Sequence, residues 1–167
     1  MANHEPDDRR ISRRSLLRLQ LARWADPVTG AVHAGLPLRA PAPVVAALVE
    51  LAEVEAGMQV LDLGTGDVAR TAVRGADVTA SDADARDLPY VDGAFDVVLS
   101  ACRTAPAAGA ARELVRVTCP GGVVALALRD SEETVRGRLG GLLDELETRA
   151  SEAGWLLVRG RRAIPQA

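Results

Sequence analysis

The sequence predicts an α/β protein with a mainly parallel sheet of about five strands, preceded by an N-terminal helical segment. Two patterns support this fold class. Short, continuous apolar runs are typical of parallel strands that are buried on both faces, and a repeat of about 3.6 residues is typical of helices. The two patterns alternate along the chain. Strands that alternate with helices form right-handed βαβ units, and these place the strands in one sheet.

Apolar runs and turn residues place the individual elements. We expect strands at 58–63, 78–81, 95–100, 122–128 and 155–159, and helices at 44–53, 107–117 and 130–154. Asp92-Gly93 and Pro120-Gly121 are turn pairs that introduce the third and fourth strands. With a single strand after the last helix, the expected strand order is 2-1-3-4-5.

The last helix is predicted from its start signal and its apolar stripe. Asp130 and Glu133 have the spacing of a capping box, which satisfies free N–H groups at a helix start. The apolar stripe runs from Val135 to Leu146, and Gly154 is a stop signal.

The first 43 residues differ in composition from the remainder. Apolar residues in 10–24 indicate a helix with an arginine-rich face, and the four prolines and two glycines of 27–43 indicate a loop or lid. We therefore expect an N-terminal helix and lid segment at 1–43, on a single globular domain at 44–167.

Composition excludes several classes of partner. A net charge of −3 provides no positive field for a polyanion, and two Trp, one Tyr and one Phe offer few platforms for stacking bases. We therefore expect no nucleic-acid partner. No run reaches the length of a membrane span, so we expect no membrane partner either. Arg13-Arg14 resembles a twin-arginine export signal, but the following stretch is broken by Gln20 and Arg23. We expect a cytoplasmic protein with two reduced cysteines.

The candidate ligand site follows the first two strands. The first strand leads into Asp62-Leu63-Gly64-Thr65-Gly66, where glycines let the backbone approach a ligand closely. Asp82 follows the second strand, where a carboxylate is the usual partner of ribose hydroxyls. Taken alone, this pattern also fits a dinucleotide-binding fingerprint. Asp62 and Asp82 could instead cap the turns that follow them.

Several segments together resemble the class I S-adenosylmethionine-dependent methyltransferases. The matching segments, in chain order, are Val60–Gly66, Asp82, Asp87-Leu88-Pro89-Tyr90, Ser100, and Arg116-Val117 with Pro120-Gly121-Gly122. The resemblance implies a three-layer, Rossmann-like fold and S-adenosylmethionine as cofactor. It also implies that Asp62, Gly64, Thr65 and Gly66 lie at the methionine part and that Asp82 binds ribose. Asp87 and Leu88 would then contact adenine, and Ser100 would lie beside the substrate cleft.

The chain departs from this family in length. The family places a helix and a third strand between the ribose acid and the Leu-Pro segment, whereas Asp82 and Asp87 are only five positions apart. The missing helix would form one wall of the adenine slot. Losing about 100 Å² of apolar contact at roughly 25 cal/mol/Å² would cost about 2.5 kcal/mol of binding free energy. The family also ends in a strand hairpin, where we expect one strand.

Few residues are candidates for chemistry. Cys102 lies just past a strand end, but no local His or Lys activates it, so a buried small hydrophobe is the preferred interpretation. His33 is the best available general base, and Arg103 could hold an anionic group. No cluster has the spacing of metal ligands.

Three functions remain open from the sequence. The first is methyl transfer from S-adenosylmethionine to a small-molecule acceptor, for example in secondary metabolism. The second is a degenerate methyltransferase-like protein that acts as a cyclase or binds a small molecule. The third is a non-catalytic protein partner, or a homo-oligomer, that docks through the arginine-rich helix at 10–24.

Overall fold

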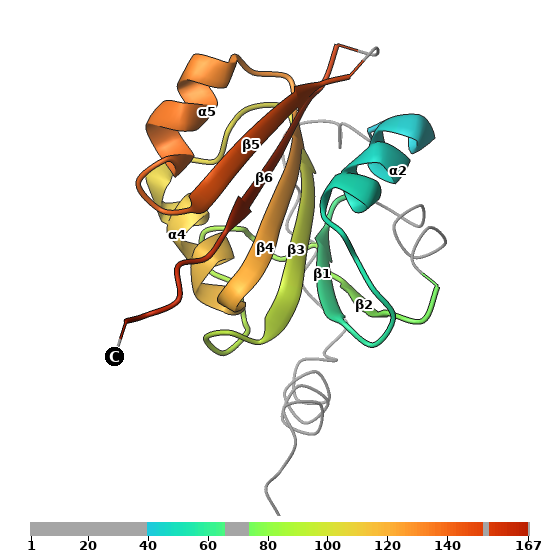
Figure 1. The fold of residues 1–167 in the computed structure, drawn as a ribbon, viewed down its shortest axis with the longest axis vertical. Helices are drawn as coiled ribbons and strands as arrows, with labels where there is room; N and C mark the ends of the chain where they lie inside the picture. The colour runs from blue at the N-terminus through green and yellow to red at the C-terminus, as the bar shows by residue number, and fades with distance from the viewer. Residues whose placement is uncertain (1–39, 66–73, 152–153, 167) are drawn as a thin grey trace, which may run out of the picture. The chain divides into compact units, whose positions relative to one another are not determined.

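The computed structural model describes residues 40–65, 74–151 and 154–166, all within the unit Ala34–Ala167 (Figure 1). Its helices are α2 (Ala42–Leu51), α4 (Ala108–Val117) and α5 (Glu132–Leu139). Its strands are β1 (Gln59–Leu63), β2 (Asp77–Ala80), β3 (Phe95–Cys102), β4 (Thr118–Leu128), β5 (Asp144–Ala150) and β6 (Leu156–Arg161). The expected helix at 10–24, the lid up to residue 39, His33 and Gly66 lie outside the described residues.

The strands form one six-stranded sheet in the order β2-β1-β3-β4-β6-β5. The first four strands are parallel, with Val60 opposite Val97 and Val98 opposite Val124. β6 runs antiparallel to β4, and β5 runs antiparallel to β6 at the edge of the sheet. The α/β class and the mainly parallel sheet are confirmed, but the expected count of five strands is wrong by one.

The error lies in the segment after α5. The helix expected at 130–154 ends at Leu139, and residues 144–150 form β5. Gly140 and Gly141 interrupt the helix, and the chain then has a period of two: Leu146 and Thr148 are half-buried between exposed neighbours. β5 and β6 therefore form the strand hairpin that the sequence interpretation left out.

The helix start also differs by one residue. Ser131, and not Asp130, is the N-cap of α5: its Oγ accepts the Thr134 N–H at 3.2 Å. Asp130 instead accepts the Ala105 N–H at 3.0 Å, which ties the chain after β3 to the chain after β4.

Both faces of the sheet are covered. α2 buries Val44, Val45 and Leu48 against side chains from β1, β3, β4 and β6, including Val60, Val97, Ala125 and Leu157. Alternation along the strands turns Leu61, Val98 and Leu126 to the opposite face, and these are also fully buried. α4 and α5 pack on that side (Figure 1). The result is the expected three-layer arrangement.

The connection from β2 to β3 is irregular. Residues 81–94 contain neither a helix nor a strand, as the five-residue spacing of Asp82 and Asp87 predicts, and β2 lies at the sheet edge. Leu88 and Tyr90 are buried, and the Tyr90 ring meets Phe95 edge-on with centroids 5.0 Å apart. These two side chains anchor the end of the connection to the core.

Candidate functional site

The carboxyl ends of four parallel strands meet at one edge of the sheet, where open α/β sheets bind their ligands. β1, β2, β3 and β4 end there at Leu63, Ala80, Cys102 and Leu128. The residues that follow these ends are therefore the candidate site.

The β1 end turns sharply, and Asp62 holds the turn. Asp62 is 2% exposed, and its Oδ1 accepts the Thr65 N–H at 2.9 Å and the Thr65 hydroxyl at 2.5 Å. Gly64 between them has φ +85°, a left-handed conformation that glycine adopts without strain. A Cβ at Gly64 would have Ala101 O as its nearest neighbour, at 3.8 Å. Asp62 thus caps the turn, and Gly64 leaves the backbone open to a ligand.

Asp82 lies close to the same turn. Ser81 donates its N–H to the Asp62 carbonyl at 2.9 Å, so the residue before Asp82 is joined to β1. Asp82 itself is exposed. Beyond it, Asp84 accepts the Arg86 N–H at 2.9 Å and forms an ion pair with the Arg86 guanidinium at 2.6 Å, which closes a small turn. The Asp82 carboxylate therefore faces solvent beside the β1 end.

Ser100 and Cys102 lie at the end of β3. The buried Ser100 hydroxyl donates to the Leu63 carbonyl at 3.0 Å and so joins β3 to the β1 end. Burial raises the pKa of the Cys102 thiol to about 11, although a hydrogen bond with Ser100 opposes the shift. A thiol with this pKa is protonated at neutral pH and is a poor nucleophile, but the residue is half-buried and not fully buried as expected.

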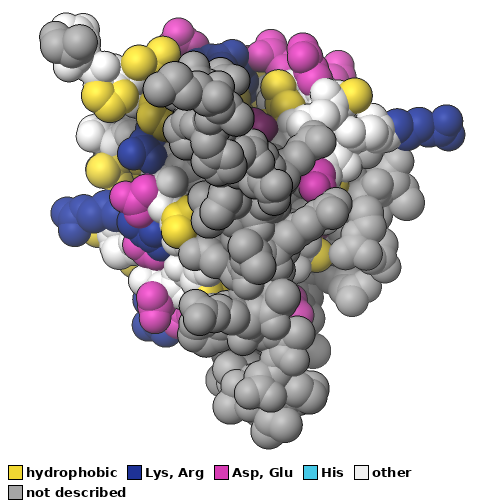
Figure 2. Space-filling model, turned by 90° about the horizontal axis from the view of Figure 1, so that it is seen from below, with side chains coloured by type: hydrophobic (Ala, Val, Ile, Leu, Met, Phe, Trp, Pro, Cys, Tyr) yellow, Lys and Arg dark blue, Asp and Glu magenta, His cyan; other side chains and the backbone are white. Residues whose placement is uncertain are grey.

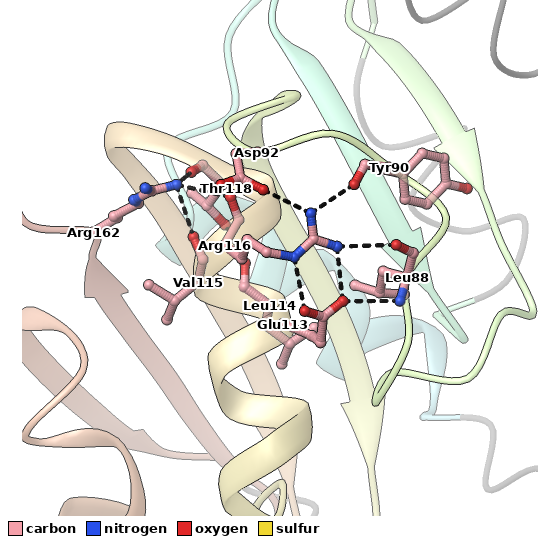
Figure 3. A network of polar contacts seen from close by, with 9 residues as sticks. All are labelled: Leu88, Tyr90, Asp92, Glu113, Leu114, Val115, Arg116, Thr118 and Arg162. Carbon is pink, nitrogen blue, oxygen red and sulfur yellow. Dashed lines mark hydrogen bonds and ion pairs between the residues drawn. The ribbon is translucent and has the colours of Figure 1, made fainter.

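The segment at Leu88 is held from α4 (Figure 3). The Leu88 N–H donates to Glu113 Oε2 at 3.0 Å, and the Leu88 carbonyl accepts from Arg116 Nη2 at 3.0 Å. Asp87 is exposed beside this anchored residue. Paired hydrogen bonds from Arg116 lower the pKa of the Glu113 carboxyl to about 2. Sequence reasoning did not place Glu113 or Arg116 in the site, although their i, i+3 spacing indicates a pair.

Two arginines follow β3 and β4 at this edge. Arg103 and Arg129 are both exposed, and the Arg129 N–H donates to the Arg103 carbonyl at 3.1 Å. The Arg129 guanidinium lies 5.2 Å from the Trp155 ring centroid, a cation–π distance. The edge thus has positive charge on the side away from Asp82.

A separate cavity of about 840 Å³ lies at the other end of the parallel strands. Its lining includes Gly57, Asp96, Gly122 and Arg161, which lie near the starts of β1, β3 and β4 and at the end of β6. None of the predicted site residues lines it. The cavity is therefore distinct from the carboxyl-end site.

Charge on the surface is mixed. Figure 2 shows both arginine and acidic side chains on the described part of one face, with several acidic side chains gathered along the upper margin of the view. In the described ranges, no group of three His, Cys, Asp or Glu side chains could hold a metal ion. None of the helices described has the length and apolar character that crossing a bilayer requires.

Comparison with known proteins assigns the fold to a family. The model of a family described as a methyltransferase domain matches residues 45–126. Comparison with curated proteins gives no match.

Solved structures share the fold at low sequence identity. One is a chain from the Haloferax volcanii complex between the Trm112 methyltransferase activator and a methyltransferase, with 16% identity and a TM-score of 0.60, covering 72% of this chain and 89% of that one. The [4+2]-cyclase SpnF has 16% identity and a TM-score of 0.58, covering 74% and 81%. YcgJ from Bacillus subtilis has 14% identity and a TM-score of 0.56, covering 74% and 99%. Residues 45–126 thus match a methyltransferase domain, and the resemblance of this chain to the class I S-adenosylmethionine-dependent methyltransferases is confirmed.

Proposed function

We propose that this protein transfers a methyl group from S-adenosylmethionine to a small-molecule acceptor in the cytoplasm. The observation that carries the proposal is the exposed Asp82 carboxylate, which the Ser81–Asp62 hydrogen bond holds beside the Gly64 turn. An acid next to a close-approach glycine suits a ligand with a ribose and a compact charged end.

The residues on either side of this pair fit parts of the same cofactor. Gly64 and Thr65, together with Gly66, would lie against the methionine part. Asp82 would accept hydrogen bonds from the two ribose hydroxyls. The exposed Asp87 carboxylate suits the adenine amine, whereas the Leu88 N–H is already bonded to Glu113. Leu88 would then contribute through its fixed position and not through that N–H.

Catalysis on this site would rest on alignment. When bound, S-adenosylmethionine supplies a methyl group that its sulfonium already activates. The chain's part is to orient the acceptor and exclude water, because an in-line approach removes much of the entropic barrier. Ser100 keeps the β1 and β3 ends together. His33, outside the described residues, is the candidate for taking the acceptor's proton.

The acceptor we propose carries an anionic group. Arg103 and Arg129 are exposed at the ends of β3 and β4, on the side away from Asp82. A guanidinium pairs well with carboxylate or phosphate oxygens. A small molecule of secondary metabolism with such a group would suit this edge.

A second candidate keeps the fold without methyl transfer. The connection at 81–94 contains no helix or strand, so the helix that forms one wall of the adenine slot in the family is absent from this connection. A neighbour on the same fold, SpnF, is a [4+2]-cyclase. The alternative is a cyclase, or a small-molecule-binding protein, that uses the same cleft. A protein partner is a further proposal, because another neighbour was solved with a methyltransferase activator.

Calorimetric titration with S-adenosylmethionine and S-adenosylhomocysteine tests the first proposal. Each hydrogen bond to a charged group contributes about 1.5–3 kcal/mol, so Asp82→Ala should weaken binding by at least about 10- to 100-fold. Asp77→Ala is the matched control, because Asp77 is exposed at the other end of β2. Equal affinity of the Asp82→Ala and wild-type proteins would refute this site. Binding without transfer of labelled methyl groups to any anionic acceptor would favour the second candidate.

A further inference from the structure

Glu113 and Arg116 form a doubly bonded pair on α4. Arg116 Nε lies 2.7 Å from Glu113 Oε1, and Arg116 Nη2 lies 2.8 Å from Glu113 Oε2. Two parallel hydrogen bonds fix the relative orientation of the two planar groups. The side chains are 20% and 31% exposed, so the pair is partly shielded from water.

The remaining hydrogen-bonding capacity of this pair is directed at the chain before β3 (Figure 3). Glu113 Oε2 accepts the Leu88 N–H, and Arg116 Nη2 donates to the Leu88 carbonyl, both at 3.0 Å. Arg116 Nη1 donates to the Tyr90 carbonyl at 2.7 Å and to Asp92 Oδ1 at 2.8 Å. Both main-chain polar groups of Leu88 are therefore hydrogen-bonded to the pair. Leu88 lies outside any strand, so no sheet ladder supplies these bonds.

The anchored segment presents its alternate residues to solvent. The side chains of Leu88 and Tyr90 are 3% and 9% exposed, whereas Asp87 and Pro89 are exposed. Asp82 lies at the other end of the same connection, which is short and irregular. Fixing Leu88 therefore limits where Asp87 and, through the chain, Asp82 can lie.

We propose that Glu113 and Arg116 are positioning residues for ligand binding: they hold the 82–88 connection in its ligand-binding conformation without touching the ligand. The inference rests on the proposed function, because it takes Asp82 and Asp87 as the groups that contact the cofactor. The pair substitutes for support that a longer connection would supply through its own secondary structure. It explains how a stretch without helix or strand can still present two carboxylates in a defined arrangement.

The contribution of the Glu113–Arg116 pair to ligand binding can be separated from its contribution to folding. α4 is held in the core by Ala111, Leu114 and Val117, which are all nearly fully buried and do not depend on the pair. Glu113→Gln keeps the size of the side chain but loses the charge that holds Arg116. We expect it to lower the thermal midpoint by several degrees while the protein stays folded at 25 °C, and to weaken S-adenosylhomocysteine binding by about tenfold. Arg116→Lys keeps the charge but loses the planar fork, and should weaken binding in the same direction.

The experiment combines calorimetry with amide hydrogen exchange on the full chain. Wild type, Glu113→Gln and Arg116→Lys are titrated with S-adenosylhomocysteine, and exchange of the Leu88 amide is followed without ligand. Glu132→Gln is the matched control, because Glu132 pairs with Arg136 on an exposed face of α5. We expect Glu113→Gln to speed Leu88 exchange by about tenfold or more, and the control to match wild type in both measurements.

The outcomes separate the two proposals. If wild type binds and Glu113→Gln binds equally well, the positioning role is wrong while the proposed function stands. If wild type does not bind S-adenosylhomocysteine, the proposed function fails and the ligand role of the pair fails with it. Unchanged Leu88 exchange in both variants would overturn the structural part of the inference independently of any ligand.

Discussion

Asp62 and Thr65 are joined twice at the end of β1, through the Thr65 N–H at 2.9 Å and the Thr65 hydroxyl at 2.5 Å from the same carboxylate oxygen. Both residues are about 2% exposed, so water cannot replace either bond. We predict that Asp62→Ala lowers the free energy of unfolding by about 1–3 kcal/mol, because it leaves a buried N–H without its acceptor. Urea denaturation measures the change.

Asp62→Asn retains an acceptor oxygen and should recover part of the loss. Asp87→Ala, at an exposed position, should change the free energy of unfolding by less than about 0.5 kcal/mol. A wild-type urea midpoint for Asp62→Ala would mean that the turn does not need the carboxylate.

Arg162 closes the C-terminal end of α4 from outside the helix (Figure 3). Its Nη1 donates to the carbonyls of Val115, Arg116 and Thr118 at 3.2, 2.8 and 2.5 Å. Helix ends leave carbonyls without intrahelical partners, and a cation there also interacts favourably with the helix dipole. Arg162→Ala should therefore destabilise the protein by about 1–2 kcal/mol in thermal or urea denaturation.

Arg112→Ala is the control for that measurement, because Arg112 is exposed on the same helix. If both variants lose equal stability, the contribution of Arg162 would be one of general charge and not of helix capping.

The Glu113–Arg116 pair predicts how the stability of the folded protein changes as the pH is lowered. The folded-state pKa of Glu113 is lowered to about 2 from an ordinary value of 4.5, mainly by its hydrogen bonds with Arg116. A group with a lowered folded-state pKa stabilises the fold above its unfolded-state pKa, and this contribution is lost as the pH falls toward 2. Urea midpoints of wild type should therefore fall between pH 4.5 and 2. Part of the fall should be missing in Glu113→Gln, and identical slopes in the two proteins would contradict the assignment.

Cys102 should be unreactive in the folded protein. With its pKa raised to about 11, the thiol carries little thiolate at pH 8, and alkylation requires the thiolate. We expect iodoacetamide to modify Cys102 at least ~100-fold more slowly than it modifies free cysteine. Mass spectrometry of a Cys119→Ser variant isolates this thiol, and unfolding in urea should restore the ordinary rate. Rapid modification of the folded variant would show an accessible, ionised thiol.

Local sequence was sufficient for much of the fold and for part of the site. β1, β3 and β4 are continuous apolar runs because both of their faces are buried, so their positions could be predicted within a few residues. The short spacing of Asp82 and Asp87 correctly implied a connection without helix or strand. The glycine turn after β1 and Asp82 after β2 were predicted at one edge, since parallel strands bring their carboxyl ends together.

What the sequence could not decide depends on contacts between distant residues. The apolar stripe from Val135 to Leu146 has helical spacing, yet residues 144–150 form β5 because β6 offers an antiparallel edge, with Thr148 opposite Val158. The Leu88 N–H donates a hydrogen bond to Glu113, 25 positions away in the sequence, and Arg162 donates one to the Thr118 carbonyl, 44 positions away. The amino-acid sequence by itself determined where the buried strands lie and which turns follow them, because those signals are local. Only the tertiary structure decided which polar groups those turns and loops bind, because such partners are selected by how the elements pack.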